Sequence, residues 1–344
     1  MAEYKNILTV SGLKAYYKLD HFGITREVRA VDDITLSIRE NEIYGIAGES
    51  SSGKTTLIKV LAAAIRPPLR IVEGSMTYRF GDKVIDPYKA GKDEVDAIRW
   101  KNLSYVMQGS MSVLNPVRRI RKSFEDFAFR PMGLPTREFW GRVETHLKRL
   151  NLSPDTLNSY PHELSGGMRQ RMTIALATVC QPQFIIADEP TTALDVVVQK
   201  DVLVMLRDVQ KQMGSSVVFV THDMSVHANM ADRIGIMYAG RLVEEGPTRT
   251  LFTAPKHPYT AHLVASLPRI GDRSPKAALE GRPPNLSDPP PGCRFHPRCP
   301  LAIDKCKVSV PPLEIVGESH RSACWRSDDV RPLTRFEGVR EETL

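Results

Sequence analysis

The sequence predicts an α/β fold with a mixed sheet, flanking helices, an inserted helical arm and a small module at the carboxyl end. Three observations predict this organisation. Apolar strands end in loops rich in glycine or acidic residues, as in open α/β sheets. A segment with helical periodicity interrupts these strands at about residues 108–178. A proline-rich stretch, "GRPPNLSDPPPG", precedes a tail that contains four cysteines. We expect a core domain at 1–255 and an appended extension at 256–344.

The length and charge set broad limits on function. A chain of 344 residues can bury one large core together with a smaller module. The net charge of +7 suits nucleotide phosphates or an anionic membrane surface, but a solvated surface with a slight excess of lysine and arginine is the favoured interpretation. The first residues lack the layout of a secretory signal, and no apolar run approaches the roughly 20 residues of a membrane helix. We expect a cytoplasmic protein that reaches a membrane only through partner subunits.

A phosphate-binding loop is predicted near the amino end. The stretch "LSIRENEIYGIAGESSSGKTTLIKVLAAA" indicates a strand, a glycine-bounded loop and a helix, and "GESSSGKT" fits the pattern G-x-x-x-x-G-K-[ST]. Consecutive backbone N–H groups surround a phosphate in such a loop, and the helix N-terminus adds a favourable dipole. Lys54 would bridge the β- and γ-phosphates of ATP, and the Thr55 hydroxyl would coordinate Mg²⁺. The residues expected to bind the nucleotide are Gly48, Glu49, Ser50, Ser51, Ser52, Gly53, Lys54, Thr55 and Thr56. The pattern also occurs by chance, but the flanking strand and helix favour a P-loop NTPase.

Two carboxylates follow a second apolar strand, "QFIIADEP". Carboxylates at strand ends face the ligand crevice of an open α/β sheet. Asp188 can therefore hold the metal ion, and Glu189 can accept a proton from the attacking water. The alternative is a pair of surface carboxylates at a strand end, which the preceding phosphate loop disfavours.

A second helix start suited to anions is predicted in "ELSGGMRQR", at Ser165, Gly166 and Gly167. One γ-phosphate does not need two such sites from one subunit, so we expect this one to serve a nucleotide bound to a neighbouring subunit. His222 ends a third strand, "SSVVFVTHD", and is expected to contact the γ-phosphate.

These motifs together resemble those of the ATP-binding subunits of ABC transporters. "GESSSGKT", "LSGGMRQR", "IIADEPTTALD" and "VTHD" occur in that order within about residues 5–255. The resemblance implies that Gln108 contacts Mg²⁺ and the attacking water, and that Asp195 lies at the interface of two ATPase subunits. It also implies that Tyr17 stacks on adenine, with Tyr16 as the rival.

One residue departs from the family pattern. Ser51 stands where the family usually has glycine, so its Cβ removes backbone freedom from the phosphate loop and puts the affinity for nucleotide in doubt.

The resemblance also implies partners. A second, related but non-identical ABC ATPase subunit, two membrane permease subunits and an extracytoplasmic substrate-binding protein would complete an importer at the cytoplasmic face of the membrane. The chain has no internal repeat, so the second nucleotide-binding unit must be another chain. A soluble ABC ATPase without transport function is the alternative, but such proteins usually carry tandem ATPase units or a long coiled-coil insertion.

The tail holds four of the five cysteines, with the spacing Cys-x5-Cys-x6-Cys-x17-Cys. In a cytosolic protein a metal or catalytic role is favoured over disulfides, although a disulfide framework or ordinary thiols stays open. Zinc sites usually contain Cys-x-x-Cys pairs, which are absent here, but His296 or His320 could replace one ligand. Cys180, outside the tail, is expected to be a packing residue. The four clustered cysteines are Cys293, Cys299, Cys306 and Cys324.

The tail resembles that of oligopeptide and dipeptide importer ATPases. That resemblance implies that the four clustered cysteines bind a [4Fe-4S] cluster, which we expect to stabilise a module too small to bury its own core. It also implies uptake of di- or oligopeptides, with oligosaccharide import by the same machine as the alternative. A nucleic-acid-binding zinc knuckle is a further alternative, but the tail lacks interleaved aromatic residues, so we expect no nucleic-acid partner.

Overall fold

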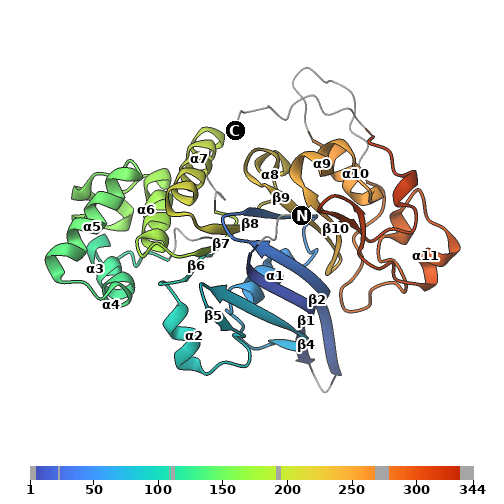
Figure 1. Ribbon diagram of the computed structural model, residues 1–344, viewed down its shortest axis with the longest axis horizontal. Helices are drawn as coiled ribbons and strands as arrows, with labels where there is room; N and C mark the ends of the chain where they lie inside the picture. The colour runs from blue at the N-terminus through green and yellow to red at the C-terminus, as the bar shows by residue number, and fades with distance from the viewer. Residues whose placement is uncertain are drawn as a thin grey trace. The chain divides into compact units, whose positions relative to one another are not determined.

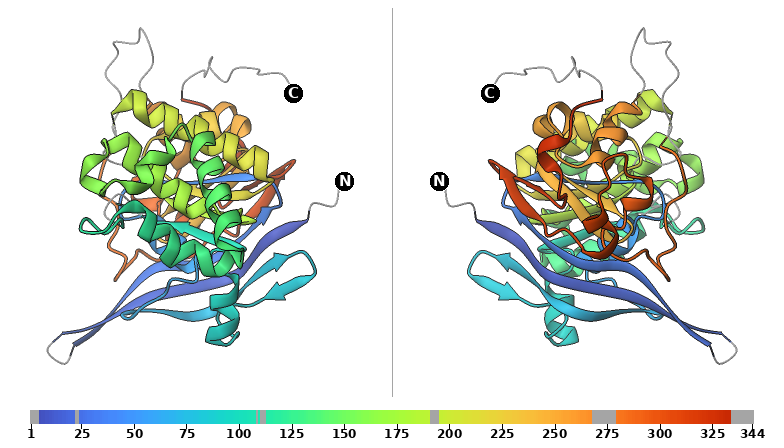
Figure 2. Two further views of the ribbon diagram at one scale, coloured as in Figure 1. Left: turned by 90° about the vertical axis from the view of Figure 1, so that its left-hand side faces the viewer. Right: turned by 90° about the vertical axis from the view of Figure 1, so that its right-hand side faces the viewer.

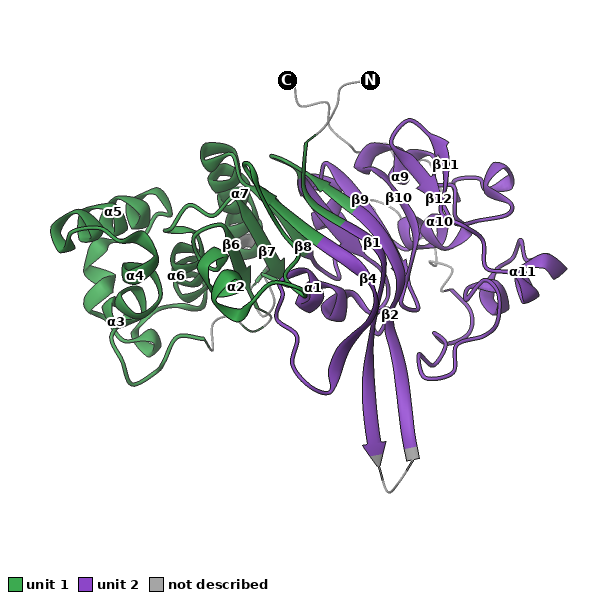
Figure 3. Ribbon diagram, turned by 60° about the horizontal axis from the view of Figure 1, so that its bottom comes forward, with its two compact units in different colours: residues 1–9, 37–42, 77–219 green, residues 10–36, 43–76, 220–344 purple. Residues whose placement is uncertain are grey.

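The computed structural model describes residues 5–21, 24–107, 109, 113–190, 195–267 and 279–333 (Figure 1). The chain forms two compact units, shown in green and purple in Figure 3. Unit 1 comprises residues 1–9, 37–42 and 77–219, and unit 2 comprises residues 10–36, 43–76 and 220–344.

Unit 2 contains most of three long strands, β1 (Asn6–His21), β2 (Ile24–Arg39) and β4 (Leu69–Phe80), in the order β2-β1-β4. Figure 2 shows β1 and β2 as a long pair. Buried side chains alternate with exposed ones along β2, where Ile34 and Leu36 are buried and Thr35 is exposed. Successive strand residues point to opposite faces, so this alternation buries one face of the strands.

A second sheet of unit 2 carries the phosphate loop. Its strands lie in the order β11-β12-β10-β9-β3. The pairing of β3 with β9 is parallel, and β9, β10, β12 and β11 pair antiparallel in turn. The register joins Glu244 of β10 to Ser322 of β12, so the tail contributes strands to this sheet. The bounds are β3 (Ile43–Ala47), β9 (Arg233–Tyr238), β10 (Arg241–Pro247), β11 (Glu314–Gly317) and β12 (His320–Ser322).

The helices of unit 2 are short. The helix after the phosphate loop is α1, and the side chain of His257 caps the start of α10 by accepting the N–H of Tyr259 at 3.1 Å. The helices are α1 (Lys54–Leu61), α8 (Met224–Met230), α9 (Thr248–Thr253), α10 (Pro258–Ala265), η5 (His296–Arg298), α11 (Asp304–Val308) and η6 (Ser327–Asp329).

Unit 1 contains the strands β6 (Leu103–Val106) and β7 (Phe184–Asp188), which pair in parallel, with β8 (Ser216–Val220) beside β7. All five residues of β7 are buried, as is usual for a strand covered on both faces. The short strand β5 (Lys83–Ile85) pairs antiparallel with the end of β4.

Between β6 and β7 the described residues of unit 1 form a series of helices with intervening loops. Within it α5 buries Phe139 and Trp140, whose rings are 4.9 Å apart. No helix in the described ranges is long and apolar enough to cross a membrane. The helices are α2 (Lys92–Ile98), α3 (Ile120–Phe124), η2 (Glu125–Phe129), α4 (Arg130–Met132), α5 (Thr136–Arg149), η3 (Pro154–Asn158), η4 (Pro161–Glu163), α6 (Gly166–Thr178) and α7 (Val196–Met213).

The α/β fold is therefore confirmed, but a separate cysteine-ligated module is not shown. The tail belongs to the same compact unit as the phosphate loop. Its strand β12 finds backbone partners in β10, and Phe295 is buried against the rings of Tyr238 and Tyr259, at 5.1 and 5.4 Å. These contacts give the tail a core that it shares with the rest of unit 2. The expected division at residues 255 and 256 stays a prediction.

Candidate functional site

The phosphate loop has the backbone shape that requires glycine at both ends. Gly48 has φ 149° and Gly53 has φ 100°. A Cβ at Gly48 would lie 2.2 Å from the carbonyl oxygen of Met237, and one at Gly53 would lie 2.0 Å from that of Ala30. Both distances are far below a normal contact, so any side chain at either position would displace backbone. The two glycines of the sequence motif thus lie where the phosphate loop closely approaches the backbone at Ala30 and at Met237.

Lys54 lies at the centre of this loop and is 4% exposed. Its ammonium group donates hydrogen bonds to the carbonyl oxygens of Gly48 and Glu49, each at 2.7 Å. Thr55 is half-buried on the first turn of α1, and the Ser52 side chain is buried beneath the loop. The loop therefore presents a cation and a helix start at one place, which suits the phosphates of a nucleotide.

Ser51 has φ 64°, in the left-handed region, and is exposed. A residue with a Cβ is less stable than glycine in this conformation. The departure noted in the sequence therefore falls on a position whose backbone favours glycine.

The two candidate adenine-stacking tyrosines have different surroundings. Tyr16 is buried, and its hydroxyl donates a 2.5 Å hydrogen bond to Asp32. Burial, followed by this hydrogen bond, raises the pKa of Tyr16. Tyr17 is half-buried, and its hydroxyl lies 3.2 Å from that of Thr56 on α1. The Tyr17 side chain thus contacts the helix of the phosphate loop, whereas Tyr16 is buried in the core, and the stacking of Tyr17 on adenine stays a prediction.

The carboxylates of the candidate metal and base sites lie in unit 1. Asp188 ends β7 and is 1% exposed. Burial, and then the charge and a hydrogen bond of Asp188, raise the pKa of Tyr105 on β6. Glu189 is 8% exposed and has φ 50°. A left-handed backbone at a residue other than glycine is uncommon and concentrates at functional sites.

The second predicted anion site forms the start of α6 in unit 1. The Ser165 hydroxyl accepts the N–H of Met168 at 3.3 Å, and Ser165 is exposed. A Cβ at Gly167 would lie 2.8 Å from Val198 of α7, and the carboxylate of Asp195 caps α7 by accepting the N–H of Val198 at 2.9 Å. The structure therefore brings Ser165, Gly166 and Gly167 close to the helix that begins after Asp195.

The two remaining candidates are a histidine and a glutamine. His222 is exposed two residues after the end of β8. Gln108 lies outside the described residues. A nearby histidine that the motifs do not include, His227, is fully buried on α8, and burial lowers its pKa to about 4.

The four tail cysteines are free thiols, of which Cys306 is buried and the others are partly exposed. The backbone N–H of Cys293 donates to the carbonyl of Cys306 at 2.8 Å. Burial, with smaller contributions from the neighbouring thiols, raises the pKa of Cys299 to about 11 and that of Cys324 to about 12. The backbone hydrogen bond places the chain at Cys293 beside the chain at Cys306. Cys180 is also a free, half-buried thiol, and burial raises its pKa to about 11.

No single-ion site is formed in the part of the chain that the structure describes, where no group of three or more histidine, cysteine or acidic side chains could hold a metal ion. The histidines considered as zinc ligands have other partners. His296 Nδ1 is 2.9 Å from the carbonyl oxygen of Cys293, and His320 Nε2 is 2.7 Å from the carboxylate of Glu244. The zinc alternative is therefore not supported, and the iron–sulfur cluster is not shown.

Two arginines of the tail, to which no motif assigned a role, contact residues of the nucleotide-binding region of unit 2. Arg294 is buried and pairs with Asp32, the partner of Tyr16. Arg298 pairs with Glu49 of the phosphate loop. Each arginine is adjacent to a cysteine in "CRFHPRC", and Arg298 belongs to the "PRC" of the importer-type tail pattern.

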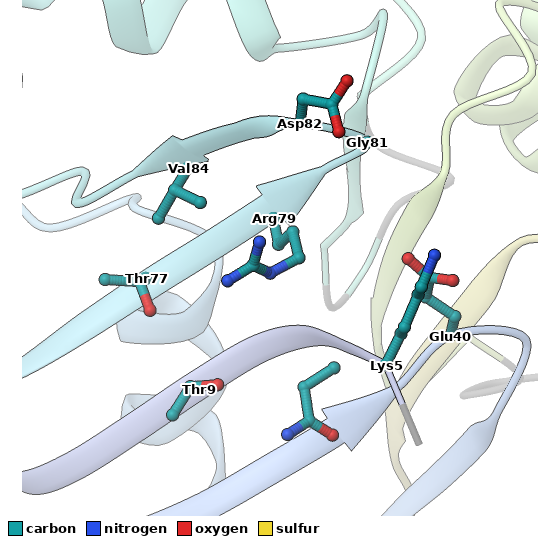
Figure 4. Close-up of a pocket in the computed structure, with 9 residues that line it drawn as sticks. Lys5, Thr9, Glu40, Thr77, Arg79, Gly81, Asp82 and Val84 are labelled. Carbon is teal, nitrogen blue, oxygen red and sulfur yellow. The ribbon is translucent and has the colours of Figure 1, made fainter. Parts of the chain in front are cut away.

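A cavity of about 530 Å³ lies elsewhere, in unit 1. Figure 4 shows Lys5, Glu40, Arg79 and Asp82 among the side chains that line it, so that both signs of charge are present. It contains none of the predicted site residues, and its mixed charges do not select a class of ligand.

Two family models and several known proteins match this chain. The family model described as ABC transporter matches residues 31–192, and the model described as oligopeptide/dipeptide transporter, C-terminal region, matches residues 243–306. A dipeptide transport ATP-binding protein, DppD, of Caldanaerobacter subterraneus subsp. tengcongensis is 38% identical over 95% of this chain and 99% of its own length. The oligopeptide transport ATP-binding protein OppD of Salmonella typhimurium is 35% identical over 87% of this chain and 89% of its own length. A solved dimeric ATP-binding cassette in a post-hydrolysis state, bound to ADP and Pi, is 27% identical with a TM-score of 0.59, and covers 70% of this chain and 99% of that one.

Proposed function

The chain belongs to the family of ABC transporter ATP-binding proteins, and from that premise we propose that it is the ATP-hydrolysing subunit of an importer of dipeptides and oligopeptides. The match of residues 243–306 to the oligopeptide/dipeptide transporter C-terminal region carries the choice of cargo class. Relatives named for dipeptide and oligopeptide transport match over almost their whole length. The glycine-dependent phosphate loop supports the ATPase activity.

In this mechanism the phosphate loop binds the β- and γ-phosphates of ATP. The Lys54 ammonium exchanges the carbonyl oxygens of Gly48 and Glu49 for phosphate oxygens, which are stronger partners because they carry charge. Mg²⁺ supplies charge neutralisation, and Thr55, Asp188 and Gln108 are the residues that would hold it. The hydroxyl at the start of α1 and the buried strand-end carboxylate are oxygen donors of the kind that Mg²⁺ prefers.

For hydrolysis we assign Glu189 as the general base and His222 as a γ-phosphate contact. A carboxylate at the end of a strand can accept the proton of the attacking water, while a positioned imidazole stabilises developing charge. Ser165 and Gly167 are proposed to bind the nucleotide of a second ATPase subunit, since the exposed start of α6 is available to a partner. Asp195 would then lie at the interface of the two subunits.

A peptide importer implies membrane permease subunits and a substrate-binding protein as partners. We propose two permeases, a related second ATPase and attachment to the cytoplasmic face of the membrane. The family matches give no support to an oligosaccharide cargo. They also disfavour an ABC ATPase without transport function, because the carboxyl end matches a transporter region.

We propose further that the four cysteines bind a [4Fe-4S] cluster. The four thiols are free, their number equals the thiolates that such a cluster takes, and a backbone hydrogen bond joins Cys293 to Cys306. Each of the four cysteines would hold a different iron of the cluster, whereas a zinc ion would need its ligands around one atom. The lack of a single-ion arrangement in the described ranges therefore bears on zinc rather than on the cluster.

The proposed function is tested by purifying the tagged chain from membranes and identifying the subunits that copurify. We expect two permeases and a second ATPase, and uptake of a labelled dipeptide that is lost when Lys54 is replaced by alanine. Uptake of a labelled oligosaccharide but no peptide would overturn the cargo assignment. Copurification with DNA-repair or ribosomal proteins and no permease would overturn the transport function.

A further inference from the structure

Glu49 of the phosphate loop and Arg298 of the tail are separated by 249 residues in sequence but form a forked ion pair in unit 2. We propose that Arg298 is a positioning residue for ATP binding, which orients and neutralises the Glu49 carboxylate so that the phosphate loop can accept the triphosphate. This inference rests on the ATP binding proposed above, and it assigns a role in that binding to the carboxyl-terminal extension.

The geometry of the pair is that of a bidentate guanidinium–carboxylate contact. Arg298 Nη1 donates to Glu49 Oε2 at 2.8 Å, and Nη2 donates to Oε1 at 3.0 Å. Two parallel hydrogen bonds fix the orientation of a carboxylate as well as its position. A lysine has one compact ammonium group and cannot reproduce this fork.

Arg298 is itself held in place on its other sides. Its side chain is only 6% exposed. Its Nε donates to the carbonyl oxygen of Glu280 at 3.0 Å, and Nη1 also donates to the hydroxyl of Tyr238 at 3.2 Å. These contacts order a long side chain before any nucleotide arrives, so the guanidinium is already placed for Glu49.

Glu49 is held from the extension at its backbone as well. Its N–H donates to the hydroxyl of Tyr259 on α10 at 2.7 Å, and its carbonyl oxygen accepts from Lys54 at 2.7 Å. Tyr259 packs against Tyr238, with ring centroids 4.7 Å apart, and Phe295 covers both rings. The extension thus holds the residue whose carbonyl positions the phosphate-binding lysine.

Charge decides the direction of the effect. Glu49 places a carboxylate in a loop that must bind a highly anionic ligand, and an unpaired carboxylate there would repel the phosphates. The Arg298 guanidinium removes this repulsion. Loss of Arg298 should therefore weaken ATP binding, because the negative charge of Glu49 is then no longer neutralised. Removal of that charge as well should restore ATP binding.

The test measures the Kd for Mg-ATP of the purified full-length chain and four variants. Arg298→Ala should bind about tenfold more weakly than the wild type, and Arg298→Lys should fall between the two. The double variant Arg298→Ala/Glu49→Gln should recover to within about threefold of the wild type, because it no longer carries the unpaired carboxylate. Arg282→Ala, which removes an exposed arginine of the same extension, is the control and should bind as the wild type does.

The outcomes distinguish a role of Arg298 in positioning Glu49 from a role in stability alone. Wild-type affinity in Arg298→Ala, or a double variant as weak as the single one, would overturn the inference. If Arg298→Ala does not fold, Arg298→Lys decides, because it keeps the cation but not the two parallel hydrogen bonds. Wild-type affinity in Arg298→Lys would then overturn the inference. A wild-type chain that binds no Mg-ATP would instead overturn the proposed function itself.

Discussion

Replacing Gly53 by alanine should disable the phosphate loop, because the structure has no space and no suitable backbone conformation for a Cβ there. Gly53 has φ 100°, and its added Cβ would lie 2.0 Å from the carbonyl oxygen of Ala30 and 3.1 Å from the carbonyl carbon. Since non-bonded contacts to a Cβ are essentially never shorter than 3.0 Å, the backbone of Ala30 or of the loop must move by about 1 Å.

The expected cost follows from two contributions. Overpacking a well-packed position costs about 1–3 kcal/mol, and a left-handed backbone costs a residue with a Cβ about 1–2 kcal/mol. Together they predict a destabilisation of unit 2 by about 2–5 kcal/mol. For a unit of this size, each kcal/mol lowers the melting temperature by about 2–4 °C, so the transition should fall by about 4–20 °C. Mg-ATP binding should be lost as well, because Lys54 follows the displaced residue directly.

Gly141→Ala is the matched control. Gly141 lies inside α5, and nothing lies within 4 Å of an added Cβ. Alanine is more favourable than glycine within a helix by about 0.8–1.0 kcal/mol, so this variant should melt at or slightly above the wild-type temperature and bind Mg-ATP normally. Thermal melting and equilibrium ATP binding of both variants check the reasoning. Normal stability and ATP affinity in Gly53→Ala would refute the assigned loop geometry.

Four further predictions concern the other parts of the site. Glu189→Gln should keep ATP binding but lower hydrolysis in the assembled complex by at least about 100-fold, the usual contribution of a general base; near-normal turnover would remove Glu189 from the mechanism. Gly167→Asp, placed in this chain alone, should leave ATP binding to the isolated chain intact, and loss of that binding would contradict a role at the partner's nucleotide. Burial lowers the pKa of His227 from 6.5 to about 4, so between these pH values the unfolded chain binds a proton at this residue and the folded chain does not. The free energy of unfolding should therefore fall by up to about 3 kcal/mol as the pH drops from 6.5 to 4. The melting temperature of His227→Leu should depend less on pH than that of the wild type, and equal pH dependence in the two proteins would contradict this assignment. Anaerobically purified protein should be brown and contain about four iron and four acid-labile sulfide atoms per chain, and the variant Cys299→Ser should be colourless. Stoichiometric zinc without iron would contradict the assignment of a cluster.

Local patterns in the sequence predicted the elements that depend on local chemistry. The spacing of Gly48 and Gly53 predicted a loop between a strand and a helix, and the structure places β3 and α1 on either side of it. The polar residues at strand ends were predicted in the same way, and Asp188 closes the buried strand β7. Such features are set by a few neighbouring residues, so one sequence is enough to recognise them.

Contacts between distant segments could not be predicted from the same sequence. Arg298 and Glu49 are 249 residues apart, and neither the proline-rich stretch nor the cysteine spacing indicates that the tail returns to the phosphate loop. The tail was expected to be a small appended module, but its strand β12 pairs with β10 because a short strand is more stable within an existing sheet. The φ of 64° at Ser51 was also beyond prediction, since only the family pattern marked the position.

The central claim is that this chain hydrolyses ATP to power peptide uptake, and peptide-stimulated ATP hydrolysis tests it most directly. The complex that copurifies with the chain would be reconstituted in liposomes, with the binding protein supplied on the side opposite the ATPase. We expect a dipeptide bound to that protein to raise the rate of ATP hydrolysis, and Glu189→Gln to abolish the increase. An ATPase rate that is the same with and without peptide, and that survives Glu189→Gln, would contradict it.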